Sequence, residues 1–148
     1  MGSRPLEPVI ANAPVSALAD HSRFVQRIRR RYAAELPLLA PGLPTRERID
    51  ALIERLQHEG RGLASAMRVT RQLVLERLAV LDVEQAAPMQ DITVAMTELA
   101  ECTLDRALAQ ARLDHEARYG TPRNAAGERI DFWVVGMGKL GARELNVS

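Results

Sequence analysis

One short segment of this sequence predicts a β-strand, and it lies near the end of a chain whose other periodic segments all predict helices. Residues 130–135 are apolar at nearly every position, which is typical of a strand buried on both faces of a sheet. A single strand leaves its backbone N–H and C=O groups unpaired, and a stable sheet requires several strands. We therefore expect the 148 residues to be a fragment, with more chain following Ser148.

Helical periodicity accounts for most of the chain before that segment. Apolar residues recur at spacings near three and four from about residue 16 to 36, where Pro37 interrupts the pattern. Thr45 is predicted to be the N-cap of a second helix. The apolar stripe of this helix consists of Ile49, Leu52, Ile53 and Leu56. We expect a third helix from about residue 63 and a fourth over residues 89–118.

These segments divide the chain into three parts. Residues 1–15 contain three prolines and predict a loose N-terminal arm. Residues 16–118 make up the predicted helical region, and residues 119–148 contain the strand and begin a second domain. The predicted fold class is therefore mostly α.

Charge and cysteine content exclude several classes of function. The net charge of +1 gives no support for binding to nucleic acid, and no apolar run approaches the roughly 20 residues that cross a bilayer. Cys102 is the only cysteine, so an internal disulfide is impossible. We interpret the protein as cytoplasmic.

A glycine-rich loop follows the predicted strand directly. Residues 136–141 read Gly-Met-Gly-Lys-Leu-Gly and match the pattern G-x-G-x-x-G. Glycines in this place let the backbone turn tightly and bring N–H groups close to an anion, and Lys139 adds a positive charge. The pattern therefore indicates phosphate binding, although a glycine turn that only packs has the same spacing.

The six-residue pattern leaves two other functions open. One is a fragment of an NAD(P)-dependent Rossmann oxidoreductase, in which an acidic residue follows the glycines by about 20 positions, beyond Ser148. The other is a non-enzymatic helical interaction module.

The longer stretch over residues 136–148 decides between them by resemblance. It closely resembles the signature G-M-G-K-L-G-G-x-E-L-N-x-S of the glutamine-synthetase adenylyltransferases, with Ala142 where glycine is usual. Residues 119–127 are similar to the G-T-P-x-N-A-x-G turn that precedes the strand in this family, and residues 22–25 resemble its early helical segment. The resemblance covers essentially the whole chain and places it in the N-terminal half of a much longer enzyme.

The resemblance implies both a fold and a reaction. Family members are bifunctional nucleotidyltransferases of the polymerase-beta-like superfamily, so residues 119–148 would be the truncated start of an α+β domain. The N-terminal half removes AMP from a tyrosine of glutamine synthetase by phosphorolysis, and the C-terminal half attaches AMP from ATP. The expected partners are glutamine synthetase and a nitrogen-signalling regulatory protein. A pair of acidic residues expected beyond Ser148 would bind Mg²⁺, so we expect this chain to be inactive alone.

The resemblance also assigns roles within the loop. The phosphate-binding residues would be Gly136, Gly138, Lys139, Gly141 and Ser148. Glu144 and Asn146 would support the loop, either as caps or through nucleotide contact, and the Cβ of Ala142 would crowd a closely bound phosphate. No catalytic residue and no metal ligand is assigned within the chain.

The remaining charged, histidine, cysteine and tryptophan side chains give little indication of a functional site. A basic run on the first helix fits either an acidic partner or a solvated helix face. It consists of Arg27, Arg29, Arg30 and Arg31. His58-Glu59 and His115-Glu116 lack the second histidine of a zinc helix, and His21 stands alone. We expect Cys102 to be a semi-buried, inert thiol and Trp133 to pack in the sheet.

Overall fold

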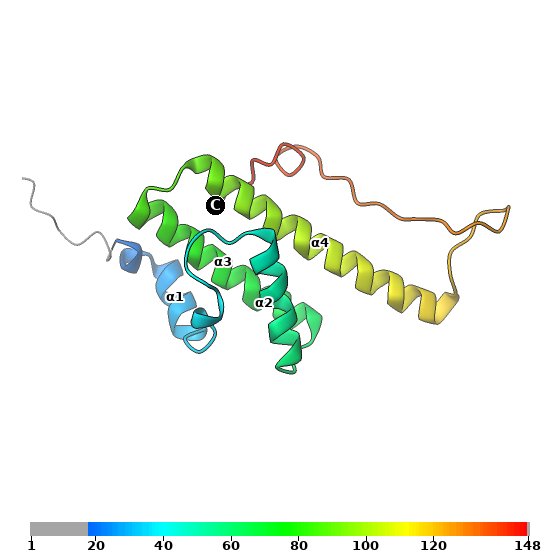
Figure 1. Ribbon diagram of the computed structural model, residues 1–148, viewed down its shortest axis with the longest axis horizontal. Coiled ribbons are helices and arrows are strands. Elements are labelled where there is room, and N and C mark those ends of the chain that lie inside the picture. Colours follow the sequence, from blue (N-terminus) through cyan, green and yellow to red (C-terminus); the bar gives the residue numbers. More distant parts are fainter. Residues whose placement is uncertain (1–17, 148) are drawn as a thin grey trace, which may run out of the picture.

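The computed structural model describes residues 18–147, and the regular structure of these residues is entirely helical (Figure 1). The elements in chain order are η2 (Ala19–His21), α1 (Arg23–Arg31), η3 (Leu36–Leu38), α2 (Arg46–His58), α3 (Leu63–Gln85) and α4 (Met89–Tyr119). The two η elements are single 3₁₀ turns. The mostly α fold class is thereby confirmed for the described residues, whereas the predicted N-terminal arm over residues 1–15 lies outside them.

Helices α2, α3 and α4 pack around one apolar core, and α1 covers α3 (Figure 1). The stripe predicted on α2 is buried completely or nearly so. Its partners on α3 and α4 include Leu73, Val74, Leu78, Ile92 and Leu99. Because α3 and α4 are neighbours in sequence and in space, they form a helical hairpin, which turns at Ala86 with a left-handed φ of 48°.

An unpaired backbone N–H group at the start of α2 is hydrogen-bonded by a side chain of another helix. Thr45 is the N-cap residue, as predicted, but its side chain accepts no capping hydrogen bond. The backbone N–H of Arg46 instead donates to Glu98 Oε2 of α4 at 3.0 Å. The first turn of a helix has N–H groups without a partner inside the helix, so a carboxylate is a favourable acceptor there.

The first predicted helix is shorter than its periodicity suggests. Ser22 adopts an extended conformation and its hydroxyl accepts from the backbone N–H of Val25 at 3.4 Å, so α1 begins only at Arg23. The helix ends at Arg31, before the proline that was expected to interrupt it. The predicted third helix begins where α3 begins, and the predicted fourth helix agrees with α4 to within a residue.

After α4 the chain reverses and runs back beside that helix (Figure 1). The buried residues of α4 all lie in its first half, from Ile92 to Cys102. The second half projects beyond the bundle, and the returning segment lies along it. Residues from the end of the chain therefore come close to the beginning of α4.

The strand predicted over residues 130–135 is not formed. Among residues 18–147 the structure contains no β-strand, and the only β-bridge joins Arg123 to Arg129. The N–H of Ile130 donates to Pro122 O at 3.0 Å, but among the described residues no second strand lies beside residues 130–135 to form a ladder with them. Trp133, which we expected to pack in a sheet, is instead 79% exposed.

None of the helices in the described part of the chain is long and apolar enough to cross a membrane.

Candidate functional site

The glycine loop folds into a compact turn stabilised by its own backbone. The N–H of Ala142 donates to Gly138 O at 2.9 Å, and the N–H of Glu144 donates to Lys139 O at 2.8 Å. The N–H of Arg143 closes a shorter turn onto Leu140 O at 3.2 Å. The loop therefore holds a defined shape although the segment before it is extended.

This shape favours glycine at one of the three signature positions and requires it at another. Gly138 has a φ of +58°, in the left-handed region that glycine enters at little cost. A Cβ on Gly141 would lie 2.6 Å from the carbonyl oxygen of Gly136, which is closer than atoms of this type approach. The backbone of the turn thus passes so near itself that only glycine fits at position 141.

The residue that departs from the family signature fits the turn. The non-glycine residues with positive φ among those described are Ala86 and Arg143, so the backbone of Ala142 is in a region that alanine readily adopts. Position 143 carries the strain instead, because an arginine there has a φ of +59°.

Arg143 ties the turn to α4. Its Nη1 lies 3.3 Å from both carboxylate oxygens of Glu101, and its Nη2 lies 3.5 Å from Glu98 Oε1. The same two carboxylates reach α2, because Glu98 accepts from the Arg46 N–H and Glu101 lies 3.6 Å from Arg46 Nη1. Glu98 and Glu101 thus hold the glycine turn and the start of α2 together.

A surface pocket of about 460 Å³ opens between the turn and the helices. The turn contributes Gly136, Gly141 and Arg143 to its wall, and α2 and α4 contribute Arg46, Glu101 and Asp105. Two arginines and two carboxylates line it, and Arg46 is ion-paired with Asp105. These charges balance one another, and Leu104, Val134 and Leu140 make the rest of the wall apolar.

The predicted site residues occupy different parts of the turn. Lys139 is exposed and is not part of the pocket wall. The side chains of Glu144 and Asn146 are also exposed, and Ser148 lies outside the described residues. Gly136 and Gly141 are thus brought together at the pocket, whereas Lys139 faces solvent.

The described residues contain no cluster of three or more potential metal ligands. No group of three or more His, Cys, Asp or Glu side chains within residues 18–147 is arranged to hold a metal ion.

A partly buried polar cluster between α2 and α4 was not predicted from the sequence. Asp50 on α2 accepts hydrogen bonds from Cys102 Sγ at 2.9 Å and from Arg106 Nε at 2.8 Å, both on α4. Arg106 also binds Glu54 at 2.8 Å. One feature of the sequence could have indicated this cluster. Asp50 and Glu54 are four residues apart, as are Cys102 and Arg106, so each pair lies on one face of its helix.

The cluster changes the acidity of its members. Burial and the neighbouring Asp50 carboxylate raise the pKa of Cys102 to about 12, so its thiol stays protonated. Burial would raise the pKa of Asp50, but hydrogen bonds from Cys102 and Arg106 outweigh it and hold the pKa below its usual value. Cys102 is fully buried rather than semi-buried, and it is inert as expected.

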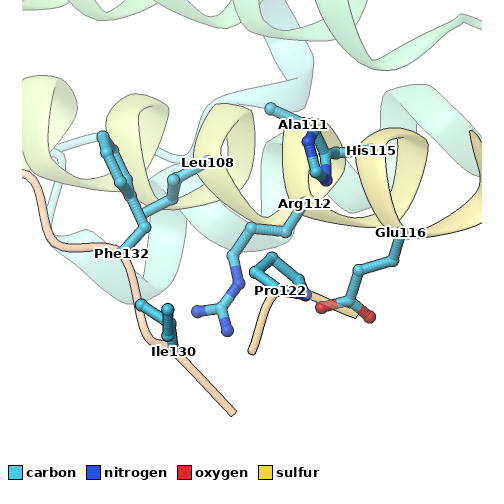
Figure 2. Close-up of a pocket in the computed structure, with 8 residues that line it drawn as sticks. All are labelled: Leu108, Ala111, Arg112, His115, Glu116, Pro122, Ile130 and Phe132. Atoms are coloured by element: carbon cyan, nitrogen blue, oxygen red, sulfur yellow. The ribbon is translucent and has the colours of Figure 1, made fainter. Parts of the chain in front are cut away.

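A second, apolar pocket of about 270 Å³ separates α4 from the returning segment (Figure 2). Figure 2 shows α4 residues on one side and Pro122, Ile130 and Phe132 on the other. Ion pairs bridge the two sides, from Arg112 to Asp131 at 2.7 Å and from Arg129 to Glu116 at 2.8 Å. These contacts hold the extended segment along the projecting half of α4.

Comparison with known proteins identifies relatives along the whole chain. The sequence profile of the glutamate-ammonia ligase adenylyltransferase family matches residues 5–148. A bifunctional glutamine synthetase adenylyltransferase/adenylyl-removing enzyme from Burkholderia mallei is 40% identical over 131 residues, which is 80% of this chain and 14% of that protein. The enzyme of the same name from Ralstonia nicotianae is 36% identical over 140 residues, 87% of this chain and 14% of that protein. That from Nitrosomonas europaea is 30% identical over 155 residues, 99% of this chain and 17% of that protein.

The chain thus spans between 14% and 17% of the length of these three relatives. No solved structure matches the chain.

Proposed function

The chain belongs to the glutamate-ammonia ligase adenylyltransferase family, and we propose that it is part of the half that removes AMP from glutamine synthetase. It would supply the helical region and the phosphate-binding turn of a polymerase-beta-like nucleotidyltransferase domain. The family match favours this function over the nicotinamide-dependent alternative, which rested on the glycine spacing alone.

The reaction proposed for that half is phosphorolysis. An oxygen of inorganic phosphate attacks the phosphorus of the AMP group that is esterified to the tyrosine of glutamine synthetase. The bond from phosphorus to the tyrosine oxygen breaks, ADP is released, and the tyrosine hydroxyl takes up a proton. The task of the turn would be to hold phosphate oxygens while this bond is exchanged.

One observation carries the proposal: Gly141 lies so close to the Gly136 carbonyl that the turn requires glycine where the family signature has it. A backbone that is forced into one shape is suited to presenting its N–H groups to an anion. Lys139, exposed on the same turn, would add a positive charge at the phosphate.

The remaining parts of the mechanism are assigned to other residues of the complete enzyme. The described residues contain no group of three or more potential ligands, and we propose that acidic residues outside this chain would hold Mg²⁺ in the complete enzyme. ATP would be the substrate of the other half, and a nitrogen-signalling protein would regulate both in the cytoplasm. Because the chain spans about a seventh of its relatives, we propose that it is inactive alone.

Two measurements test these assignments. In a complete family enzyme carrying this segment, Gly138→Val and Lys139→Ala should lower nucleotide or phosphate affinity by about tenfold or more, as expected for loss of an anion contact. Gly62→Ala is the control, since a Cβ there meets nothing within 4 Å and the φ is ordinary. Unchanged affinity in both variants would favour a non-enzymatic helical module. Release of ADP from adenylylated glutamine synthetase by the isolated chain would disprove its inactivity.

A further inference from the structure

The outer face of α1 carries a row of arginines. Arg23, Arg27 and Arg31 follow one another at four-residue intervals, and all three are exposed. This spacing places each guanidinium about 6 Å along the helix axis from the next. Side chains four residues apart on a helix are neighbours, so the like charges of this row repel one another.

The charge of this row is not compensated within the described residues. Arg29, on the opposite side of α1, donates to Glu76 of α3 at 2.7 Å and is paired with Asp20. Among residues 18–147, no carboxylate forms an ion pair with any arginine of the row. Asp20 and Glu76 are therefore used by Arg29, and the outer row has no ion pair among the described residues.

Two of the three arginines in the row lie over aromatic rings. The Cζ of Arg27 lies 6.0 Å from the ring centre of Phe24, and the Cζ of Arg31 lies 5.5 Å from that of Tyr32. Packing of this kind occupies the flat face of a guanidinium and leaves the N–H donors at its edge available. Such donors are suited to paired hydrogen bonds with a carboxylate.

A pocket of about 320 Å³ lies beside these residues and gives the face an apolar element. Its wall combines the two arginines with rings and aliphatic carbon. The lining residues are Phe24, Arg27, Ile28, Arg31, Tyr32 and Gln72. The last of these comes from α3, so the pocket bridges two helices.

We propose that this α1 arginine face, formed by Arg23, Arg27, Arg31 and the adjoining pocket, binds an acidic segment of a partner protein. The segment is helical, with carboxylates one turn apart that match the arginine spacing and an apolar side chain that enters the pocket. A protein partner fits better than nucleic acid, because the chain as a whole has a net charge of only +1. The proposal needs neither the glycine turn nor a nucleotide, so it goes beyond the proposed function.

The test uses a synthetic helical peptide that carries Glu at every fourth position and a leucine on the same face. Binding to the 148-residue chain is followed by fluorescence anisotropy of the labelled peptide at low and high salt. Arg27→Gln/Arg31→Gln should weaken binding about tenfold or more, and added salt should weaken binding to the unaltered chain. A peptide with Gln in place of each Glu should not bind.

The matched control is Arg118→Gln. Arg118 is also exposed, its Cζ lies 5.2 Å from the ring centre of Tyr119, and it forms no ion pair among the described residues. It lies at the far end of α4, away from α1 (Figure 1). This variant removes the same charge from the same kind of contact and should bind the peptide as tightly as the unaltered chain.

Several results would overturn the proposal. They are equal weakening by Arg118→Gln, equal binding of the Gln peptide, and tighter binding of single-stranded DNA that depends on Arg27 and Arg31. The peptide is also titrated against a complete family enzyme carrying this segment. Loss of binding there would show that the rest of the polypeptide covers the face, which would exclude a separate partner.

Discussion

The Nη1 atom of Arg143 lies 3.3 Å from both carboxylate oxygens of Glu101, and this contact joins the glycine turn to the helical bundle. The two residues are separated by the whole reversal of the chain after α4, so the contact fixes the end of a long extended segment. Arg143 also has a left-handed backbone, a conformation that costs an arginine free energy. Its ion pairs with α4 offset that cost.

We expect Arg143→Ala to loosen the turn without unfolding the bundle. The contacts are partly exposed, and exposed ion pairs contribute at most about 1 kcal/mol, so amide exchange at Ala142 and Glu144 should rise by about two- to fivefold. Hydrogen–deuterium exchange read by mass spectrometry measures this. Glu101→Gln should have a similar effect, because it removes the negative charge with which Arg143 is paired.

Arg112→Gln separates this effect from general loosening of the returning segment. It breaks the ion pair with Asp131 in the middle of that segment and leaves Arg143 intact. Exchange at residues 138–144 should stay unchanged in this variant. If Arg112→Gln and Arg143→Ala loosened the turn equally, Arg143 would not be its specific anchor.

Gly141→Ala tests the close approach inside the turn. The new Cβ would lie 2.6 Å from the carbonyl oxygen of Gly136, so the turn must open. Because the turn is on the surface, the free energy of unfolding should change by less than about 0.5 kcal/mol, while the amide resonances of residues 136–144 shift. Ala142→Gly, which restores the usual family residue, should leave those resonances close to their original positions. A native-like spectrum for Gly141→Ala would contradict the geometry described here.

The helical part of the fold was predictable because its signals are local. The stripe on α2 and the glycines before α3 identify elements whose hydrogen bonds are made within a few residues. The predicted bounds of α1 were too wide, because Ser22 adopts an extended backbone just before the helix and the helix ends at Arg31, ahead of Tyr32. The predicted strand is not formed among the described residues, since an apolar run becomes a strand only when a partner strand lies beside it.

The candidate site was predictable only in part. The glycine pattern correctly indicated a tight turn, and Gly141 shows why, but no pattern indicated that Arg143 would reach Glu98 and Glu101. That contact joins residues more than 40 positions apart, and a single sequence contains no periodic signal for such a pair. The roles of Lys139, Glu144 and Asn146 toward phosphate stay predictions.

Acid should destabilise the bundle through Asp50. Hydrogen bonds hold the pKa of Asp50 below 3.8 in the folded chain, so the unfolded chain binds this proton more readily. The contribution of Asp50 to stability is therefore present above that pH and is lost as the pH falls through the folded pKa. In urea titrations across the acid range, Asp50→Asn should lose part of the pH dependence seen in the unaltered chain.

Arg106→Gln should also reduce the dependence of the free energy of unfolding on pH in the acid range. This variant removes the hydrogen bond that Arg106 donates to Asp50. Cys102→Ala should do so as well, although by less, since a thiol is a weak donor. Full retention of the acid dependence in Asp50→Asn and Arg106→Gln would show that other groups cause it.

Trp133 reports whether the predicted strand is paired. It is the only tryptophan in the chain and is 79% exposed, so all indole fluorescence comes from a side chain in contact with water. We expect a red-shifted emission that changes little on unfolding in urea, and quenching by acrylamide almost as strong as in the unfolded chain. In a complete family enzyme, pairing of residues 130–135 with further strands should shift the emission to the blue and protect the indole. A blue-shifted, protected emission from the isolated chain would instead mean that these residues find a partner without the rest of the enzyme, in a second copy of the chain. Dilution of the chain distinguishes that case, because a signal from association falls with concentration.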